Sequence, residues 1–87
     1  MNIFVLDKCP KIAAKSLCDK HVVKMVLESA QMLSTALWQH NVEAPYKPAY
    51  INHPCTLWSG KTRSNFDWLL KHSWALLVQY QARYQRV

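Results

Sequence analysis

Glycine, acidic residues and long apolar runs are all scarce in this sequence of 87 residues. One glycine and four prolines favour helices joined by few sharp turns. No apolar run approaches the roughly 20 residues that a membrane-spanning helix needs, so no membrane association is expected. The opening stretch NIFVL is too short for the core of a signal peptide, and we therefore expect a cytoplasmic protein.

Acidic side chains number five against eleven Lys and Arg, which gives a net charge of +6 at pH 7. Such an excess in a small chain favours polyanionic partners, nucleic acid first. Three cysteines, an odd number without close pairing, argue against a disulfide scaffold. Hydrophobic residues make up 51% of the chain, so we expect a folded protein, with one small helical domain over residues 1–87.

The segment Asp19–Gln39 has the clearest helical pattern in the chain. As a helix it would be about 31 Å long, with a polar stripe only about 80° wide on one face. An ordinary surface helix has a broad polar face, so the narrow stripe predicts a partly buried cleft. The alternative is a solvated face with Glu–Lys pairing. The stripe consists of His21, Lys24, Glu28, Gln31 and Thr35.

The other segments complete an all-α prediction of two long packed helices, a short N-terminal helix and a long irregular loop. Asn2–Leu6 reads as a lone strand or an extended arm. Lys11–Leu17 reads as a short helix, with Asp7 as a cap and Pro10 in the first turn. Residues 41–58 contain three prolines and no period, and Ser59-Gly60 reads as a break.

A last helix is predicted over Asn65–Arg83, begun by Thr62 or Ser64 as a cap. We expect it to pack on the central helix, with Trp68, His72 and Gln79 on the opposite side. The predicted apolar face contains Phe66, Leu69, Leu70, Ser73, Leu77, Tyr80 and Tyr84.

The predicted loop is long for a compact domain, which favours a functional role. Basic groups there can hold phosphates while aromatic rings stack on exposed bases. We expect Trp38, Trp68 and Trp74 to serve helix packing instead. The candidate substrate-binding residues of this region are Tyr46, Lys47, Tyr50, Asn52, His53, Trp58, Lys61 and Arg63.

A zinc site is an alternative that the sequence leaves open. Its ligands would be Cys18, His21, His53 and Cys55, although the spacing differs from the usual Cys-x2-Cys pairs. The other interpretation is that these cysteines are small buried hydrophobic residues. The chain has no Gly-rich phosphate loop, Walker motif or deaminase pattern, and we expect no cofactor.

Amine chemistry is a further candidate, because a Schiff base with an abasic sugar aldehyde needs a neutral amine. An α-amino group has a pKa near 7.7–8.0, whereas a lysine has one near 10.4. The amine of Met1 is therefore a better nucleophile than Lys24, unless burial strongly lowers the pKa of Lys24. Glu28 could then protonate the sugar ring oxygen or move protons during elimination.

Two motifs carry a resemblance to a known family. Asp19-Lys20-His21 is followed by Glu28 seven positions after the histidine, and Gly60 precedes FDWLL at 66–70. Together they make the chain similar to the pyrimidine-dimer DNA glycosylase/AP lyase family of endonuclease V type known from phages. The stretches MNIFVLD, CDKHVVKM, QMLSTA and NHPC also resemble a group of small phage proteins.

This resemblance implies damaged or abasic DNA as the substrate, an imine at the N-terminal amine and Glu28 as acid and base. His21 and Lys24 would orient Glu28 or contact phosphate, and Gln31 would bind substrate. If phage-encoded, the protein would act in the host cytoplasm. The rival hypothesis is a non-enzymatic phage protein that binds a nucleotide or a host factor, in an anti-defence or host-takeover role.

The chain departs from the family pattern at three places. Leu27 and Gln31 stand where the family has Arg, just before and three residues after the catalytic Glu. The family's nucleophile is the amine of a Thr exposed by Met removal. Here Asn2 follows Met1 and opposes that removal, so the reactive amine would belong to Met1. The family's aromatic, Lys-rich C-terminal tail is missing.

Overall fold

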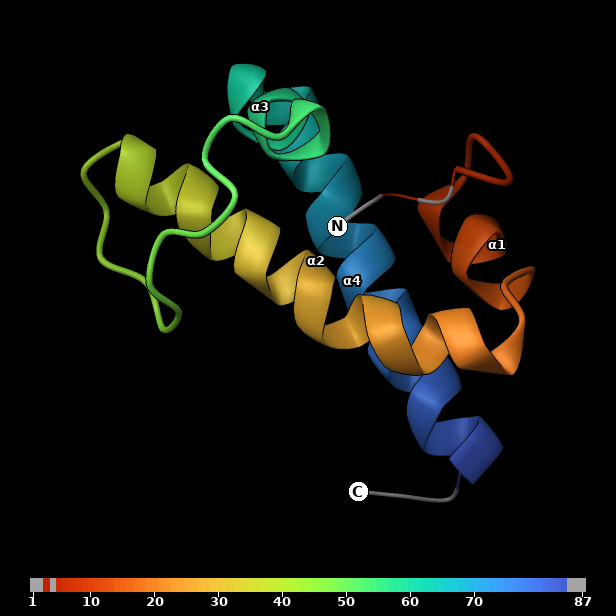
Figure 1. The fold of residues 1–87 in the computed structure, drawn as a ribbon. Helices are drawn as coiled ribbons and strands as arrows, with labels where there is room; N and C mark the ends of the chain where they lie inside the picture. The colour runs from red at the N-terminus through yellow and green to blue at the C-terminus, as the bar shows by residue number, and fades with distance from the viewer. Residues whose placement is uncertain (1–2, 4, 85–87) are drawn as a thin grey trace.

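The computed structural model of the protein describes residues 3 and 5–84. Four helices make up the fold of these residues (Figure 1). In chain order they are α1 (Pro10–Lys15), α2 (Asp19–Gln39), α3 (Pro54–Lys61) and α4 (Arg63–Tyr84). No strand occurs within the described residues, and the all-α prediction is confirmed. Ile3, Val5 and Leu6 belong to neither helix nor strand, while Asn2 of the predicted strand lies outside the described residues.

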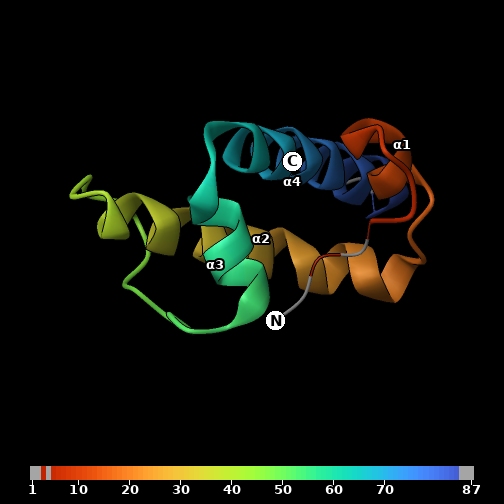
Figure 2. The ribbon, with the colours of Figure 1, turned by 90° about the horizontal axis from the view of Figure 1, so that it is seen from above.

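The two long helices form the body of the molecule. Seen from above, α4 lies beside α2, with α1 against α4 and α3 on the side of α2 (Figure 2). One apolar cluster joins α1, α2 and α4, and Ile3, Cys55 and Phe66 pack against it. Burial of these side chains is the main force that holds the helices together. The cluster consists of Ala14, Leu17, Val22, Met25, Met32, Leu33, Leu69, Ala75 and Leu76.

Helix α1 begins and ends slightly earlier than the sequence pattern suggests. Pro10 occupies its first turn, where a missing N–H costs nothing. Asp7 does not cap the helix directly. Its Oδ1 accepts a hydrogen bond of 2.9 Å from the backbone N–H of Cys9, the N-cap residue. The helix stops at Lys15 rather than Leu17.

Arg83 from α4 closes the far end of α1. Its Nη2 donates to the carbonyl of Lys15 at 2.9 Å, and its Nη1 donates to the carbonyl of Leu17 at 2.6 Å. The same Nη1 lies 3.0 Å from Oδ1 of Asp19. The guanidinium thereby satisfies carbonyl groups that a helix end leaves without partners, and it ties α1 to the start of α2.

Helix α2 has the predicted bounds, although its N-cap residue is Cys18 and Asp19 is its first residue. Its last residue is Gln39 and its C-cap is His40, and Asn41, which follows, has a left-handed φ of 62°. The N–H of Asn41 donates to the carbonyl of Trp38, and that of Val42 donates to the carbonyl of Leu37. This pattern is a Schellman motif, and asparagine tolerates the left-handed position better than most residues.

Helix α3 corrects the prediction of irregular backbone throughout 41–58. Pro54 does not interrupt structure here but begins a helix, and Ser59 and Gly60 lie inside that helix rather than at a break. Nδ1 of His53 accepts a hydrogen bond of 3.1 Å from the N–H of Cys55, which caps the helix. A Cβ at Gly60 would lie 3.4 Å from Cβ of Ala36, at van der Waals contact, so α3 packs directly against α2 at this point.

Helix α4 is capped by Thr62, as predicted, because its Oγ1 accepts a 3.0 Å hydrogen bond from the N–H of Asn65. Its predicted apolar face is confirmed at Leu69, which is buried in the core, but it is wrong at Leu70, which is half exposed. His72, predicted on the opposite side, is only 1% exposed. The reason is that α1 covers this flank of α4. The carbonyl of Pro10 in α1 accepts a hydrogen bond of 2.9 Å from Nδ1 of His72. Trp74, expected in the packing, is 69% exposed.

Candidate active site

Glu28 lies on the flank of α2, beside the residues that face the core. Its side chain is only 16% exposed, whereas that of Lys24, one turn earlier, is 62% exposed. Lys24 Nζ and Glu28 Oε2 are 3.9 Å apart, a separation that gives charge attraction rather than a strong hydrogen bond. The carboxylate is therefore not on a fully solvated face, and the cleft along the stripe stays a prediction.

The rest of the stripe becomes progressively more buried along α2. His21 and Gln31 are half-buried, and Thr35 is fully buried. Oγ1 of Thr35 lies 2.9 Å from the carbonyl of Gln31 and accepts a 3.1 Å hydrogen bond from the N–H of Ala49. Thr35 is thus an anchor for the loop that follows α2, and it brings that loop next to Gln31.

The loop 41–53 carries exposed aromatic rings held on a fixed backbone. The indole Nε1 of Trp38 donates to the carbonyl of Tyr46 at 2.7 Å, which fastens the first half of the loop. Tyr50 has a left-handed φ of 50° and a side chain that is 63% exposed. A bulky residue rarely adopts this conformation, and strain of this kind clusters at binding sites. Lys47 and Asn52 are also exposed.

His53 and Trp58 combine candidate binding roles with structural contacts. His53 is half-buried and caps α3. The Trp58 ring packs edge-on against that of Trp68, with centroids 6.2 Å apart and planes at 82°. Trp68 in turn stacks on His72 at 4.8 Å. About a third of Trp58 remains exposed at the edge of this row of rings.

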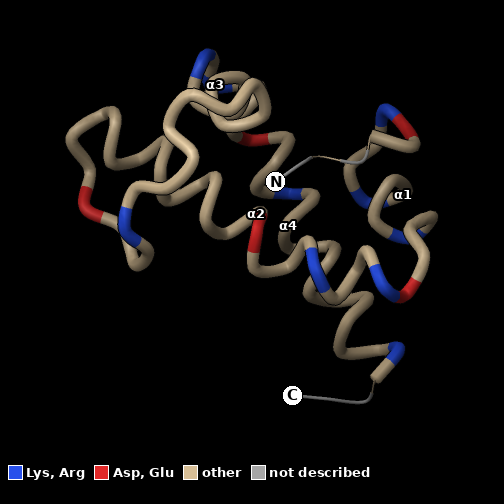
Figure 3. The backbone as a smooth tube through the Cα atoms, viewed as in Figure 1, with Lys and Arg blue, Asp and Glu red and all other residues tan. Residues whose placement is uncertain are grey.

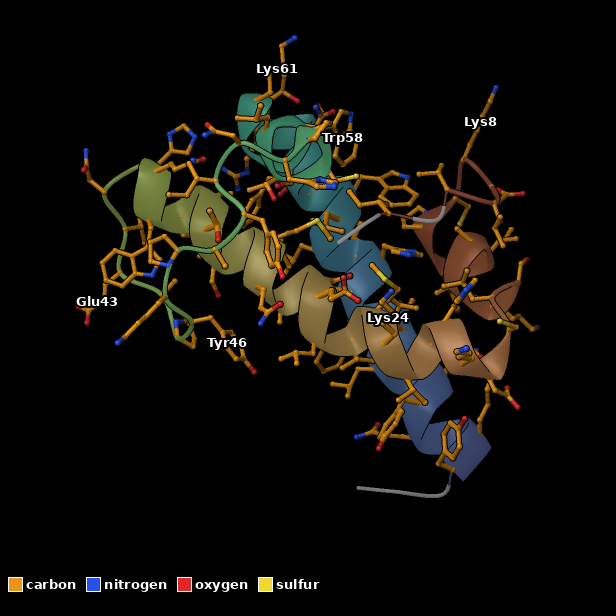
Figure 4. All side chains as sticks on the ribbon, in the orientation of Figure 1. Lys8, Lys24, Glu43, Tyr46, Trp58 and Lys61 are labelled. Carbon is orange, nitrogen blue, oxygen red and sulfur yellow. The ribbon has the colours of Figure 1, made fainter. Side chains whose placement is uncertain are left out.

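Lys61 and Arg63 lie at the α3–α4 junction, apart from the carboxylate. With His40 and Phe66 they line a cavity of about 460 Å³. Arg63 Nε also pairs with Oδ1 of Asp67 at 3.2 Å. Figure 4 shows Lys61 pointing outward at the end of α3, well away from Lys24. The predicted residues therefore form two groups, one around the stripe and the loop and one around this cavity.

Positive charge is spread over much of the molecule. Figure 3 shows Lys and Arg on α1, at the start of α2 and around the α3–α4 junction, with acidic residues scattered singly. Three of the acids have basic neighbours: Asp19 pairs with Arg83, Glu28 with Lys24 and Asp67 with Arg63. Such a field suits an extended polyanion better than a small neutral ligand.

A family model for pyrimidine dimer DNA glycosylase matches residues 1–86. The chain belongs to this family. Neither the curated proteins nor the solved structures gave a match. Membership in a family of pyrimidine dimer DNA glycosylases supports a general role in DNA repair and DNA as the substrate class.

In this member of the pyrimidine dimer DNA glycosylase family, the two residues that stand at the positions of the expected arginines, Leu27 and Gln31, differ in their surroundings. Leu27 is about half exposed, so an apolar side chain occupies a position open to solvent. Gln31 is half-buried beside the Thr35 anchor. Met1, the expected source of the amine, lies outside the described residues.

The described residues do not bring the four ligands of the zinc alternative together. No group of three or more His, Cys, Asp or Glu side chains within residues 3 and 5–84 is placed to bind a metal ion. The three cysteines form no disulfide within the described residues, and Cys18 is exposed at the start of α2. None of the helices in this part of the chain is long and apolar enough to cross a membrane.

Sequence reasoning missed two residues of the cavity and one anchor in this glycosylase family member. His40 lines the cavity and its Nε2 lies 3.0 Å from the carbonyl of Gly60. Phe66 belongs to the FDWLL stretch, but periodicity assigned it only to packing. Thr35 gave no local signal for its contact with Ala49, fourteen residues later.

Proposed function

We propose that this protein is a DNA glycosylase/AP lyase that acts on damaged or abasic DNA through a Schiff base at the amine of Met1. The carrying observation is Glu28, a carboxylate only 16% exposed on the flank of α2, at the family's catalytic spacing from His21. A carboxyl group in such a site can exchange protons with a bound sugar while bulk water is partly excluded.

The nucleophile in this proposal is the N-terminal amine, and Ile3 ties that end of the chain to the core. Ile3 packs against the core cluster, to which α2 contributes Met25 and Met32. Two residues of chain span at most about 7 Å, so this anchor limits the reach of the Met1 nitrogen. Lys24 suits the role less well, because its exposed ammonium lacks the desolvation that activates a lysine.

The proposed reaction begins when the neutral amine attacks C1′ of the damaged nucleotide. The N–C1′ bond forms, the glycosidic bond breaks, and the base leaves with the bonding electron pair and takes up the proton that the amine nitrogen loses. Glu28 donates its proton to the ring oxygen as the sugar opens to the imine. The Glu28 carboxylate then removes a proton from C2′, the C3′–O bond breaks, and water finally releases the amine.

The remaining predicted residues have supporting roles in this proposal. His21 and Lys24 orient Glu28 or contact phosphate, and Gln31 contacts the sugar. The exposed rings of Tyr46 and Tyr50 stack on bases, and basic side chains hold the backbone. The residues that would hold the nucleotide and its phosphates are Tyr46, Lys47, Tyr50, Asn52, His53, Trp58, Lys61 and Arg63.

Trapping with borohydride on abasic duplex DNA tests the proposal. We expect the wild-type protein to form a covalent adduct, and Glu28→Gln to slow single-turnover strand cleavage at least about 100-fold. Two residues added before Met1 should abolish trapping, because they displace the amine. Glu43→Gln is the matched control, since Glu43 is an exposed carboxylate on the loop. The mechanism is rejected by a missing adduct, or by one that survives both changes.

A second candidate is a nucleotide-binding protein without turnover. The observation that favours it is the cavity of about 460 Å³, which combines Lys61 and Arg63 with the ring of Phe66. Such a site could hold a phosphate group and a stacked base. Calorimetry with a nucleotide panel and with abasic DNA separates the two. Tight nucleotide binding that Arg63→Ala weakens, without any cleavage of DNA, would support this second function.

A further inference from the structure

A separate concave surface lies between α1 and α4. It has a volume of about 870 Å³, and Lys11 and Lys15 of α1 face Lys71 and Trp74 of α4 across it. At about 100° per residue, Trp74 lies about 140° around α4 from Leu69, which is buried in the core. This α1–α4 groove therefore opens on the side of α4 that does not pack on α2.

The groove is distinct from the proposed active site. None of its lining residues comes from α2, α3 or the loop 41–53. Figure 2 shows α1 and α4 on one side of the molecule, with α2 and α3 on the other. The chain thus has a second surface with its own chemistry, which the proposed glycosylase reaction does not use.

The chemistry of the groove combines a free aromatic face with uncompensated positive charge. Three lysines line it and no Asp or Glu does. Trp74 is 69% exposed, and its neighbours Leu70 and Val78 on the same face are about half exposed. A purely apolar partner would make no use of the three lysines. A partner with acidic groups alone would leave the indole ring of Trp74 exposed to solvent.

We propose that the α1–α4 groove binds single-stranded nucleic acid. Trp74 stacks on an exposed base, while Lys11, Lys15 and Lys71 contact consecutive phosphates. Single strands fit better than duplex, because in a duplex both faces of each base are covered by its neighbours, whereas an unpaired base offers a free π-face to an aromatic side chain. The lysines supply the sequence-independent part of the binding.

Fluorescence anisotropy with a labelled oligothymidylate of 12 nucleotides tests this proposal. We expect Trp74→Ala to weaken binding at least about tenfold, and Trp74→Phe to retain most of the affinity because a ring remains. Lys71→Ala should weaken binding and reduce the slope of log K against log salt by about 0.7. Lys20→Ala is the matched control, because Lys20 is exposed on α2 outside the groove. Circular dichroism melting confirms that each variant is folded.

Four outcomes would overturn the assignment. The first is that the wild-type protein does not bind the oligonucleotide, and the second is that Trp74→Ala binds it as well as the wild type. The third is that only Tyr50→Ala loses binding, because this result would place the strand on the loop. The fourth is a dimer in light scattering that Trp74→Ala dissociates without any effect on the oligonucleotide. Glu28→Gln should bind the oligonucleotide normally, so failure of the glycosylase proposal is distinguishable from failure of this one.

Discussion

At the residue scale, Ser29 is notable because its hydroxyl group is buried in the core and makes no hydrogen bond to the described residues. It is 1% exposed, and its Oγ has no hydrogen-bond partner among the described residues. A buried polar group without a partner costs about 1–3 kcal/mol. Because Ser29 directly follows Glu28, this cost falls on the stretch of α2 that carries the proposed acid.

Ser29→Ala is therefore expected to stabilise the protein. The change removes the unpaired hydroxyl and favours the helix, so the free energy of unfolding should rise by about 1 kcal/mol and Tm by roughly 4–8 °C. Thermal unfolding followed by circular dichroism measures it. Ser59→Ala is the control, because the buried Ser59 hydroxyl donates to the carbonyl of Thr56 at 2.8 Å. A gain in both variants, or in neither, would contradict this account.

His72 is expected to make stability depend on pH. Burial lowers the pKa of His72 below its ordinary value, and the hydrogen bond to the carbonyl of Pro10 opposes this only in part. The unfolded chain therefore binds the proton more readily, and stability is lost as pH falls below about 6.5. Urea unfolding between pH 7.5 and 5.5 should show this loss in the wild-type protein and a smaller loss in His72→Gln. An equal loss in both proteins would exclude His72 as the cause.

At the scale of elements, the junction of α1, α2 and α4 depends on one guanidinium. Arg83 bonds the carbonyls of Lys15 and Leu17 and pairs with Asp19, so it serves three segments at once. Asp19 is part of the motif that resembles the family. Its ion pair with Arg83 gives it a structural role in addition to any role in starting the main helix.

Arg83→Ala should destabilise the protein by about 2 kcal/mol, because two carbonyls lose a charged donor. For a domain of this size the corresponding fall in Tm is roughly 8–16 °C. Differential scanning calorimetry provides the measurement. Arg63→Ala is the comparison, since its side chain is 89% exposed and its pair with Asp67 should contribute less than about 1 kcal/mol. Equal shifts in the two variants would show that Arg83 is no more than a surface charge.

At the scale of the whole molecule, charge governs the expected affinity for DNA. The chain has a net charge of +6, yet Leu27 and Gln31 occupy positions where its family has Arg. Leu27→Arg combined with Gln31→Arg should therefore tighten binding to duplex DNA. Each new phosphate contact should steepen the dependence of log K on log salt by about 0.9. Titrations at 50 and 200 mM salt check this, with Val23→Arg as a control for charge alone. The expectation fails if the control gains as much per added charge.

The sequence predicts the long helices well because their signals are local. The polar stripe and the apolar period define α2, and Asn41 marks its end. Helix α3 was missed because prolines read as breaks, although a proline in the first turn is compatible with a helix.

The surroundings of the site depend on contacts that no local pattern reveals. The hydrophobic pattern does not show which flank of α4 is covered by α1. His72 was therefore predicted away from the packed face but is buried, and Trp74 was predicted in the packing but is exposed. Trp68 donates to the carbonyl of Lys8, sixty residues earlier in the chain. Glu28 could be proposed from the sequence because its spacing from His21 is a sequence property, whereas its low exposure is seen only in the fold.

The Arg83 contacts also bear on the order of folding. They join residues 66 and 68 positions apart in the chain, so the entropy of closing a very long loop must be overcome before they form. The contacts between α2 and α3 close shorter loops and should form sooner. We therefore expect α1 to dock late in folding and to come away first during unfolding, which would open the Trp74 surface before the carboxylate site is disturbed.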